Sequence, residues 1–167
     1  MQSWFSKASV KRTIISSLMA TLTIGLLGFL TQHTGYMVIL PSFGATCAII
    51  FITPTSRLAR PLSIFGGHIL TSIIGILIGR WCGSSWWALA LAVGAAVLLM
   101  QSLDIVHPPA AANPLLIMLQ GVTDWGFVIT PVLVGSLLLA VITAAYRCFC
   151  RQELEYQEVR RILQKNI

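Results

Sequence analysis

The stretch Val106-His107-Pro108-Pro109-Ala110-Ala111-Ala112-Asn113-Pro114-Leu115-Leu116-Ile117-Met118-Leu119 interrupts a chain that otherwise reads as nearly continuous apolar helix. Proline lacks the N–H that a helix interior needs and its ring collides with the preceding turn, whereas the first turn of a helix tolerates it. The sequence therefore predicts extended backbone at His107-Pro108 and a short helix from Ala110 to about Leu119. Within a membrane, such irregular backbone is stable only where protein buries it or where it lines a watery cavity.

The composition indicates an integral membrane protein. Of the 167 residues, 56% are hydrophobic and 10% are charged, with a mean hydropathy of +0.84, whereas about a quarter of the residues in a soluble domain are charged. The net charge of +6 comes from basic residues in the tails and short loops, which is typical of topology signals rather than of nucleic-acid binding. No nucleophile–base pair, phosphate loop or metal cluster is recognisable, so we expect no enzyme, cofactor or metal site, and free thiols at the four cysteines.

The apolar runs divide the chain into an N-terminal tail (residues 1–12), a transmembrane domain (residues 13–147) and a C-terminal tail (residues 148–167). We interpret the C-terminal tail as an amphipathic helix that lies on the membrane surface or packs on a neighbouring subunit. The transmembrane domain contains six expected membrane segments: Thr13–Thr31, Gly35–Thr53, Leu62–Gly79, Trp86–Leu103, a segment beginning at His107, and Phe127–Tyr146.

A second broken segment lies in the first half of the chain. Pro41-Ser42-Phe43-Gly44 interrupts an apolar run and predicts extended chain to about Pro41, followed by a short helix from Phe43 to Ile52. At one constant offset, Pro41–Ile50 aligns with Pro108–Ile117, and Thr46 falls on Asn113. Each half, residues 13–79 and residues 86–147, thus has the order span, broken segment, span. We interpret the halves as a repeat, inverted if each broken segment crosses the membrane.

The distribution of arginines favours six crossings over four. With six crossings, both tails and the loop that contains Arg57 and Arg60 lie in the cytoplasm, and only Arg80 lies outside, as the positive-inside rule requires. If the broken segments were re-entrant, Arg57 and Arg60 would lie outside. We therefore expect a multi-pass protein of the bacterial inner membrane with both termini in the cytoplasm.

Two half-helices that begin inside a membrane predict a place for an anion. Their first turns present unpaired N–H groups and the positive ends of the helix dipoles, and broken helices at matching positions of a repeat indicate a midplane site. The alternative is that the small residues there only allow close helix packing. The candidate binding residues are Ser42, Gly44, Ala45, Thr46, His107, Pro109, Ala110, Ala111 and Asn113.

Two histidines are candidate gating residues. An ionisable side chain within a span, such as His68, suggests a functional role, and His107 titrates near neutral pH in its unperturbed form. The alternative for His107 is a capping or packing role, and His68 could lie close enough to the cytoplasm to be hydrated. No span has Asp or Glu near its centre, which leaves a channel, a uniporter or coupling through histidine.

The motifs together resemble those of the HPP family of small bacterial and plastid membrane proteins. The resemblance rests on Pro41-Ser42-Phe43-Gly44-Ala45-Thr46, on Arg60-Pro61 with Gly66-Gly67-His68, and on His107-Pro108-Pro109-Ala110. It implies a multi-span membrane protein and, for some plastid and cyanobacterial members, nitrite transport. Many relatives continue with a glycine and a second small polar residue where this chain has Ala111-Ala112-Asn113-Pro114, within the expected ligand site.

We therefore expect a transporter or channel for a small monovalent anion, with nitrite as the first candidate. Because an 18.2 kDa chain is small for a transporter, we also expect a homo-oligomer, a dimer or a trimer, with glycine-rich faces in contact. Its partners would be the inorganic anion and the lipid bilayer. The alternative is a non-transporting membrane sensor or assembly module, in which the half-helices are only packing devices.

Overall fold

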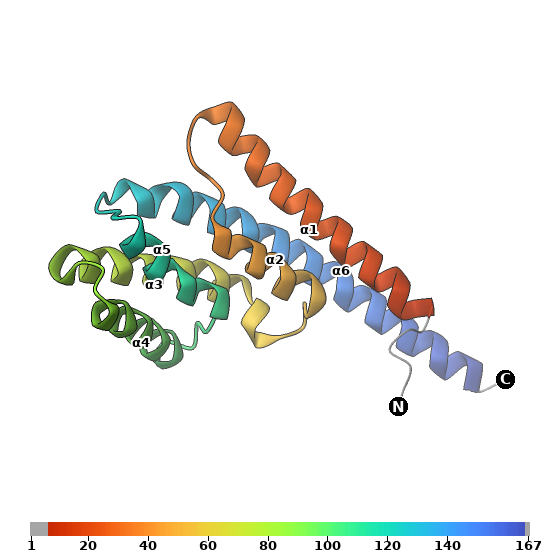
Figure 1. The fold of residues 1–167 in the computed structure, drawn as a ribbon. Helices are drawn as coiled ribbons and strands as arrows, with labels where there is room; N and C mark the ends of the chain where they lie inside the picture. Colours follow the sequence, from red (N-terminus) through yellow and green to blue (C-terminus); the bar gives the residue numbers. More distant parts are fainter. Residues whose placement is uncertain (1–6, 166–167) are drawn as a thin grey trace.

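The protein is an all-helical membrane protein, as the composition predicted. The computed structural model describes the backbone from Lys7 to Lys165 and the side chains from Val10 to Cys150, and no strand occurs in that part of the chain (Figure 1). Three helices are long and apolar enough to cross a membrane, namely Val10–Thr34, Pro61–Cys82 and Val128–Cys150. The elements are α1 (Lys7–Thr34), α2 (Pro41–Ile52), η1 (Arg57–Ala59), α3 (Pro61–Cys82), α4 (Trp86–Ser102), η2 (Pro108–Ala112), α5 (Asn113–Leu119), η3 (Val128–Leu133) and α6 (Val134–Lys165).

The prolines determine where the two short helices begin. Leu40 is extended (φ −126°, ψ 149°) and α2 starts at Pro41, two residues before the expected start. His107 is also extended (φ −138°, ψ 96°). The chain then forms the 3₁₀ turn η2 before α5 begins at Asn113, three residues after the expected start at Ala110. Pro114 occupies the first turn of α5, where its missing N–H removes no helical hydrogen bond.

Helix α3 is the centre of the packing. It contacts α4, α5 and α6 and all three short turns. Its glycines explain how the second broken segment comes so close, because a Cβ at Gly67 would lie 3.1 Å from the Cβ of His107 and one at Gly75 would lie 2.8 Å from the Cα of Pro114. Gly66 and Gly79 likewise face Ile105 and Met118. This glycine face is therefore filled within the protomer, and an oligomer would have to use other surfaces.

The last helix differs from the expected single span followed by a separate tail. Thr130 departs from helical geometry (φ −128°, ψ 123°) just before Pro131, because the proline interrupts the hydrogen-bond ladder. Beyond this kink, α6 continues unbroken to Lys165, since no proline or glycine follows Gly135. The predicted boundary at residue 148 is thus no break in the backbone. The amphipathic character of the tail depends on side chains that lie outside the described ones.

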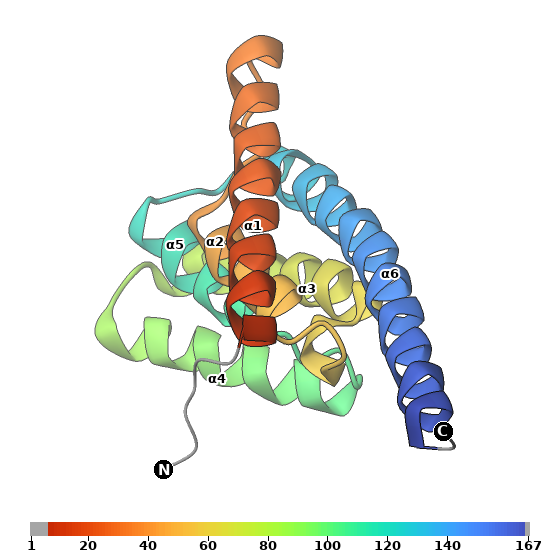
Figure 2. The same cartoon turned by 90° about the vertical axis from the view of Figure 1, so that its right-hand side faces the viewer.

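The first helix also begins earlier than expected. Helix α1 starts at Lys7, inside the predicted N-terminal tail. The start of α1 and the end of α6 lie on the same side of the molecule, as Figures 1 and 2 both show.

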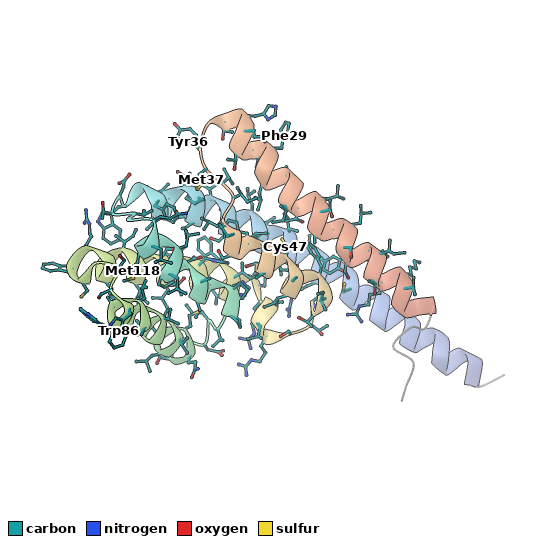
Figure 3. All side chains as sticks on the ribbon, in the orientation of Figure 1. Phe29, Tyr36, Met37, Cys47, Trp86 and Met118 are labelled. Carbon is teal, nitrogen blue, oxygen red and sulfur yellow. The ribbon has the colours of Figure 1, made fainter. Side chains whose placement is uncertain are left out.

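Apolar side chains both fill the interior and cover the outside. One core joins α1, α2 and α6 around Phe43, Ile50 and Leu139, and a second lies around the alanines that α4 places at every fourth position: Ala88, Ala92 and Ala96. Figure 3 shows side chains covering the outer surfaces of the helices as well, and Phe29 and Trp86 are 55% and 82% exposed. An apolar exterior is what a hydrocarbon environment favours.

Substitution of Gly75 by alanine should destabilise the fold. The added methyl group would meet the backbone of Pro114 at 2.8 Å, and overpacking of this kind costs about 1–3 kcal/mol. We expect a lower melting temperature for the detergent-solubilised protein, measured as loss of the monodisperse size-exclusion peak after heating. Gly94→Ala is the matched control, because nothing lies within 4 Å of a Cβ at that position. Equal melting temperatures for the two variants would contradict the proposed close contact of α3 and α5.

Candidate functional site

Six polar side chains gather in the interior, and we refer to them as the polar cluster. They come from α2, α3, α5 and the residue just before η2, and each is at most 8% exposed. Buried polar groups are costly unless they are hydrogen-bonded, and each member of the cluster has a partner within it. The members are Ser42, Thr46, His68, Ser72, His107 and Asn113.

The starts of the two short helices meet in this cluster. Ser42 is the second residue of α2 and Asn113 is the first residue of α5. The Ser42 hydroxyl donates to Oδ1 of Asn113 at 2.8 Å. The two residues are 71 positions apart in the chain, so this hydrogen bond directly joins the two broken segments.

The Asn113 amide determines which nitrogen of His68 carries the proton. Its Nδ2 lies 3.3 Å from the carbonyl oxygen of His68, which can only accept a hydrogen bond, so the NH₂ group must point there. The same Nδ2 lies 3.1 Å from His68 Nδ1 and 3.0 Å from Ser72 Oγ. Nδ1 of His68 therefore acts as an acceptor, and the neutral ring carries its proton on Nε2.

The Thr46 hydroxyl connects the two histidines. Its Oγ1 lies 3.0 Å from Nε2 of His68 and 2.9 Å from Nε2 of His107. Nδ1 of His107 lies 2.8 Å from the carbonyl oxygen of Leu58, so that nitrogen must donate. The two rings are in edge contact, with centroids 5.2 Å apart. Every ring nitrogen of both histidines thus has a hydrogen-bond partner.

The structure brings together only part of the predicted site. Ser42, Thr46, His107 and Asn113 meet there, together with His68. Gly44 and Ala45 lie on the exposed part of α2, outside the cluster. Pro109 and Ala110 are buried and Ala111 is half-buried, but none of the three belongs to the cluster.

Two members of the site escaped the sequence analysis. Ser72 contacts Asn113, and it lies four residues after His68, a spacing that places both on one face of α3. This spacing could have identified it. The carbonyl oxygen of Leu58 had no signal in the sequence, because any residue type provides one.

Charged side chains hold the loop between α2 and α3 in place next to the cluster. Asp104 accepts hydrogen bonds from Arg57 and Arg60, each at 3.1 Å. The hydrogen bond from Arg60 and the charge of Arg57 lower the pKa of Asp104, which keeps this carboxylate ionised near neutral pH. Arg147, the first residue after the expected sixth span, donates to three backbone carbonyls of the same loop, those of Pro54, Ser56 and Ala59.

The fold and this site together define a helical membrane protein with a polar site enclosed among its helices. The sequence matches the family model for the transmembrane region of HPP proteins over residues 5–155. The chain therefore belongs to the HPP transmembrane family, and the resemblance seen in the sequence is confirmed.

Two relatives are transmembrane proteins of Dictyostelium discoideum. One is 31% identical over 122 residues, which cover 69% of this chain and 43% of the relative. The other is 30% identical over 146 residues, which cover 83% of this chain and 47% of the relative. The chain thus spans less than half the length of these relatives. No solved structure matches it.

Replacement of Asn113 by leucine should strongly destabilise the protein. The change keeps the side-chain volume similar but leaves Ser42, Ser72 and His68 without their shared partner, and each buried unsatisfied group costs about 1–3 kcal/mol. We expect a large drop in melting temperature in detergent. Gln101→Leu is the control, because Gln101 is exposed at the end of α4. A melting temperature for Asn113→Leu at or above that of the unmodified protein would show that the cluster contributes nothing to folding.

Proposed function

We propose that this protein transports a small monovalent anion across the membrane, with nitrite as the first candidate. The observation that carries the proposal is the polar cluster, in which six buried polar side chains bond to one another within an interior whose other buried side chains are mostly apolar. Polar and ionisable side chains inside a membrane are costly and typically mark the path of a substrate. The family resemblance adds that some plastid and cyanobacterial members are associated with nitrite.

The chemistry of the cluster favours an anion over a cation. It offers the hydroxyls of Ser42 and Thr46, the NH₂ of Asn113 and the Nε2–H of His68 as donors, and it contains no carboxylate. Hydrogen bonds from such donors to an ionised acceptor are stronger than those between neutral groups. A cation would find only neutral oxygen and nitrogen acceptors there.

The dimensions of the cluster favour a small, singly charged ligand. Neighbouring polar atoms of its side chains lie between 2.8 and 3.1 Å apart. An ion of a few atoms can replace one or two of these hydrogen bonds, whereas a larger ion would force α2 and α5 apart. The cost of removing an ion from water also rises steeply with its charge, and uncharged donors offset it poorly.

The cluster is closed in this structure, because none of its side chains is more than 8% exposed. Transport therefore requires a movement that opens it. The loop that contains Arg57, Leu58 and Arg60 contacts His107 through the Leu58 carbonyl, and we propose that an entrance opens there. We assign this entrance to the cytoplasmic side, in a bacterial inner membrane with both termini in the cytoplasm. The shared side of the start of α1 and the end of α6 and the positive-inside rule support this orientation.

Loss of the Ser42 hydroxyl should weaken anion uptake without preventing folding. A hydrogen bond to a charged group contributes about 1.5–3 kcal/mol, so Ser42→Ala should raise the half-saturating nitrite concentration at least about tenfold. Uptake is measured in liposomes that contain the purified protein, for nitrite, nitrate, formate, chloride and sulfate. Ser102→Ala is the control, because Ser102 is exposed and bonds only to Leu98 within its own helix.

Two results would contradict the proposal. One is the absence of saturable uptake of every anion by a protein that remains folded in the liposome. That result would instead support the sensor or assembly role. The other is saturable uptake that Ser42→Ala and Ser102→Ala leave equally unchanged, because the anion would then bypass the cluster.

A further inference from the structure

One proton of the polar cluster has two possible hydrogen-bond acceptors. The Leu58 carbonyl requires a proton on Nδ1 of His107, and the Asn113 amide requires one on Nε2 of His68. The His68 proton is donated to Oγ1 of Thr46. The hydroxyl proton of Thr46 then has two acceptors within reach, Nε2 of His107 at 2.9 Å and the carbonyl oxygen of Ser42 at 3.1 Å.

The two positions correspond to two protonation states of His107. When Thr46 donates to Nε2, His107 is neutral. When Thr46 instead donates to the Ser42 carbonyl, Nε2 of His107 can carry a proton and donate it to Thr46. The Thr46 oxygen has two lone pairs and can accept from both histidines. The second state holds one proton more than the first, leaves these polar atoms partnered, and needs only a rotation of the Thr46 hydroxyl.

His68 cannot take the proton in the same way. Its unprotonated nitrogen, Nδ1, accepts from the NH₂ of Asn113 at 3.1 Å, so a proton there would face another donor. Turning the amide would place Oδ1 of Asn113 against the carbonyl oxygen of His68 and would deprive the Ser42 hydroxyl of its acceptor. The arrangement therefore distinguishes the two histidines, although both are buried.

From these contacts we propose that His107 is a proton-binding site and that its proton crosses the membrane together with the anion. The proposal rests on the proposed function. The proton comes from water on the side where the cluster opens, binds Nε2 of His107, and returns to water on the other side. No bond other than N–H and hydrogen bonds forms or breaks.

The charges around His107 show why the anion needs this proton. On the elements packed against His107, α3 presents the neutral His68 and α2 presents the Thr46 hydroxyl, and α5 contributes an amide that contacts His68. The nearby Asp104 in its own loop is exposed and paired with Arg57 and Arg60. No fixed positive charge thus belongs to the cluster within the described side chains. An imidazolium at His107 would make a bound anion part of a neutral pair, which costs far less in an apolar interior.

The decisive experiment counts the protons that accompany nitrite. Liposomes with the purified protein and an internal pH-sensitive dye are exposed to a nitrite gradient, and uptake by protein-free liposomes is subtracted. We expect one proton for each nitrite and a rate that does not respond to an imposed membrane potential. His107→Gln should reduce proton-coupled uptake at least tenfold. His33→Gln is the matched control and should change nothing, because His33 is exposed and bonds only to Phe29 in its own helix.

A pair of threonine variants tests the role of the shared hydroxyl. Thr46→Ser keeps an oxygen between the two histidines and should retain the one-to-one ratio. Thr46→Val has nearly the same shape but no hydroxyl, and it should lose proton-coupled uptake as His107→Gln does. Equal behaviour of the serine and valine variants would overturn the assignment of Thr46 as the group that positions the proton.

A second measurement examines the proton site without transport. The chain has three histidines, so ¹⁵N NMR of histidine-labelled protein in lipid nanodiscs can follow each ring between pH 5 and 9. With nitrite present, so that the imidazolium has its anion, we expect His107 to change from the Nδ1–H form to the doubly protonated form, and His68 to remain in the Nε2–H form. If His107 stays neutral throughout, the proton site is refuted. Nitrite uptake without protons would refute the coupling but leave the proposed function intact. A titrating His107 with no anion uptake would refute the proposed function but leave the proton site.

Discussion

The need of buried polar groups for hydrogen-bond partners is the constraint on which this structure depends. Asn113 satisfies it for several elements at once, because its amide binds Ser42 on α2 and both His68 and Ser72 on α3. In an apolar interior no water is available to replace a lost partner. The relative positions of α2, α3 and α5 are therefore specified by directional contacts, which apolar packing alone provides only weakly.

These contacts are possible only because α3 lets the second broken segment come close. Gly67 leaves room for His107, and Gly75 leaves room for the backbone at Pro114. A larger residue at either place would push the segment away and lengthen the hydrogen bonds of His68 to its neighbours. The glycines of α3 thus serve the polar cluster, which gives a physical reason for the adjacent positions of Gly67 and His68 in the sequence.

The sequence predicted the helical class and most helix positions, because proline, glycine and tryptophan mark the ends of the apolar runs. Helix α4 begins at the expected Trp86, whereas the kink at Thr130 was missed because Pro131 was read as part of a continuous span. Within the site, the 3.6-residue period explains why Ser42 and Thr46 share a face of α2 while Gly44 points elsewhere. The meeting of His68 with His107 was beyond reach, since it depends on the packing of distant segments.

If the cluster carries a proton and an anion as proposed, its closed state also limits how they can move through it. Nδ1 of His107 donates to the Leu58 carbonyl in both protonation states, so protonation alone does not release the loop that covers the ring. An anion acts differently, because it competes for the hydroxyl of Ser42 and the amide of Asn113, which join α2 to α5. Under the proposed mechanism, opening thus requires the anion as well as the proton. Such a dependence would prevent a proton leak through an empty site, which a carrier in an energised membrane must avoid.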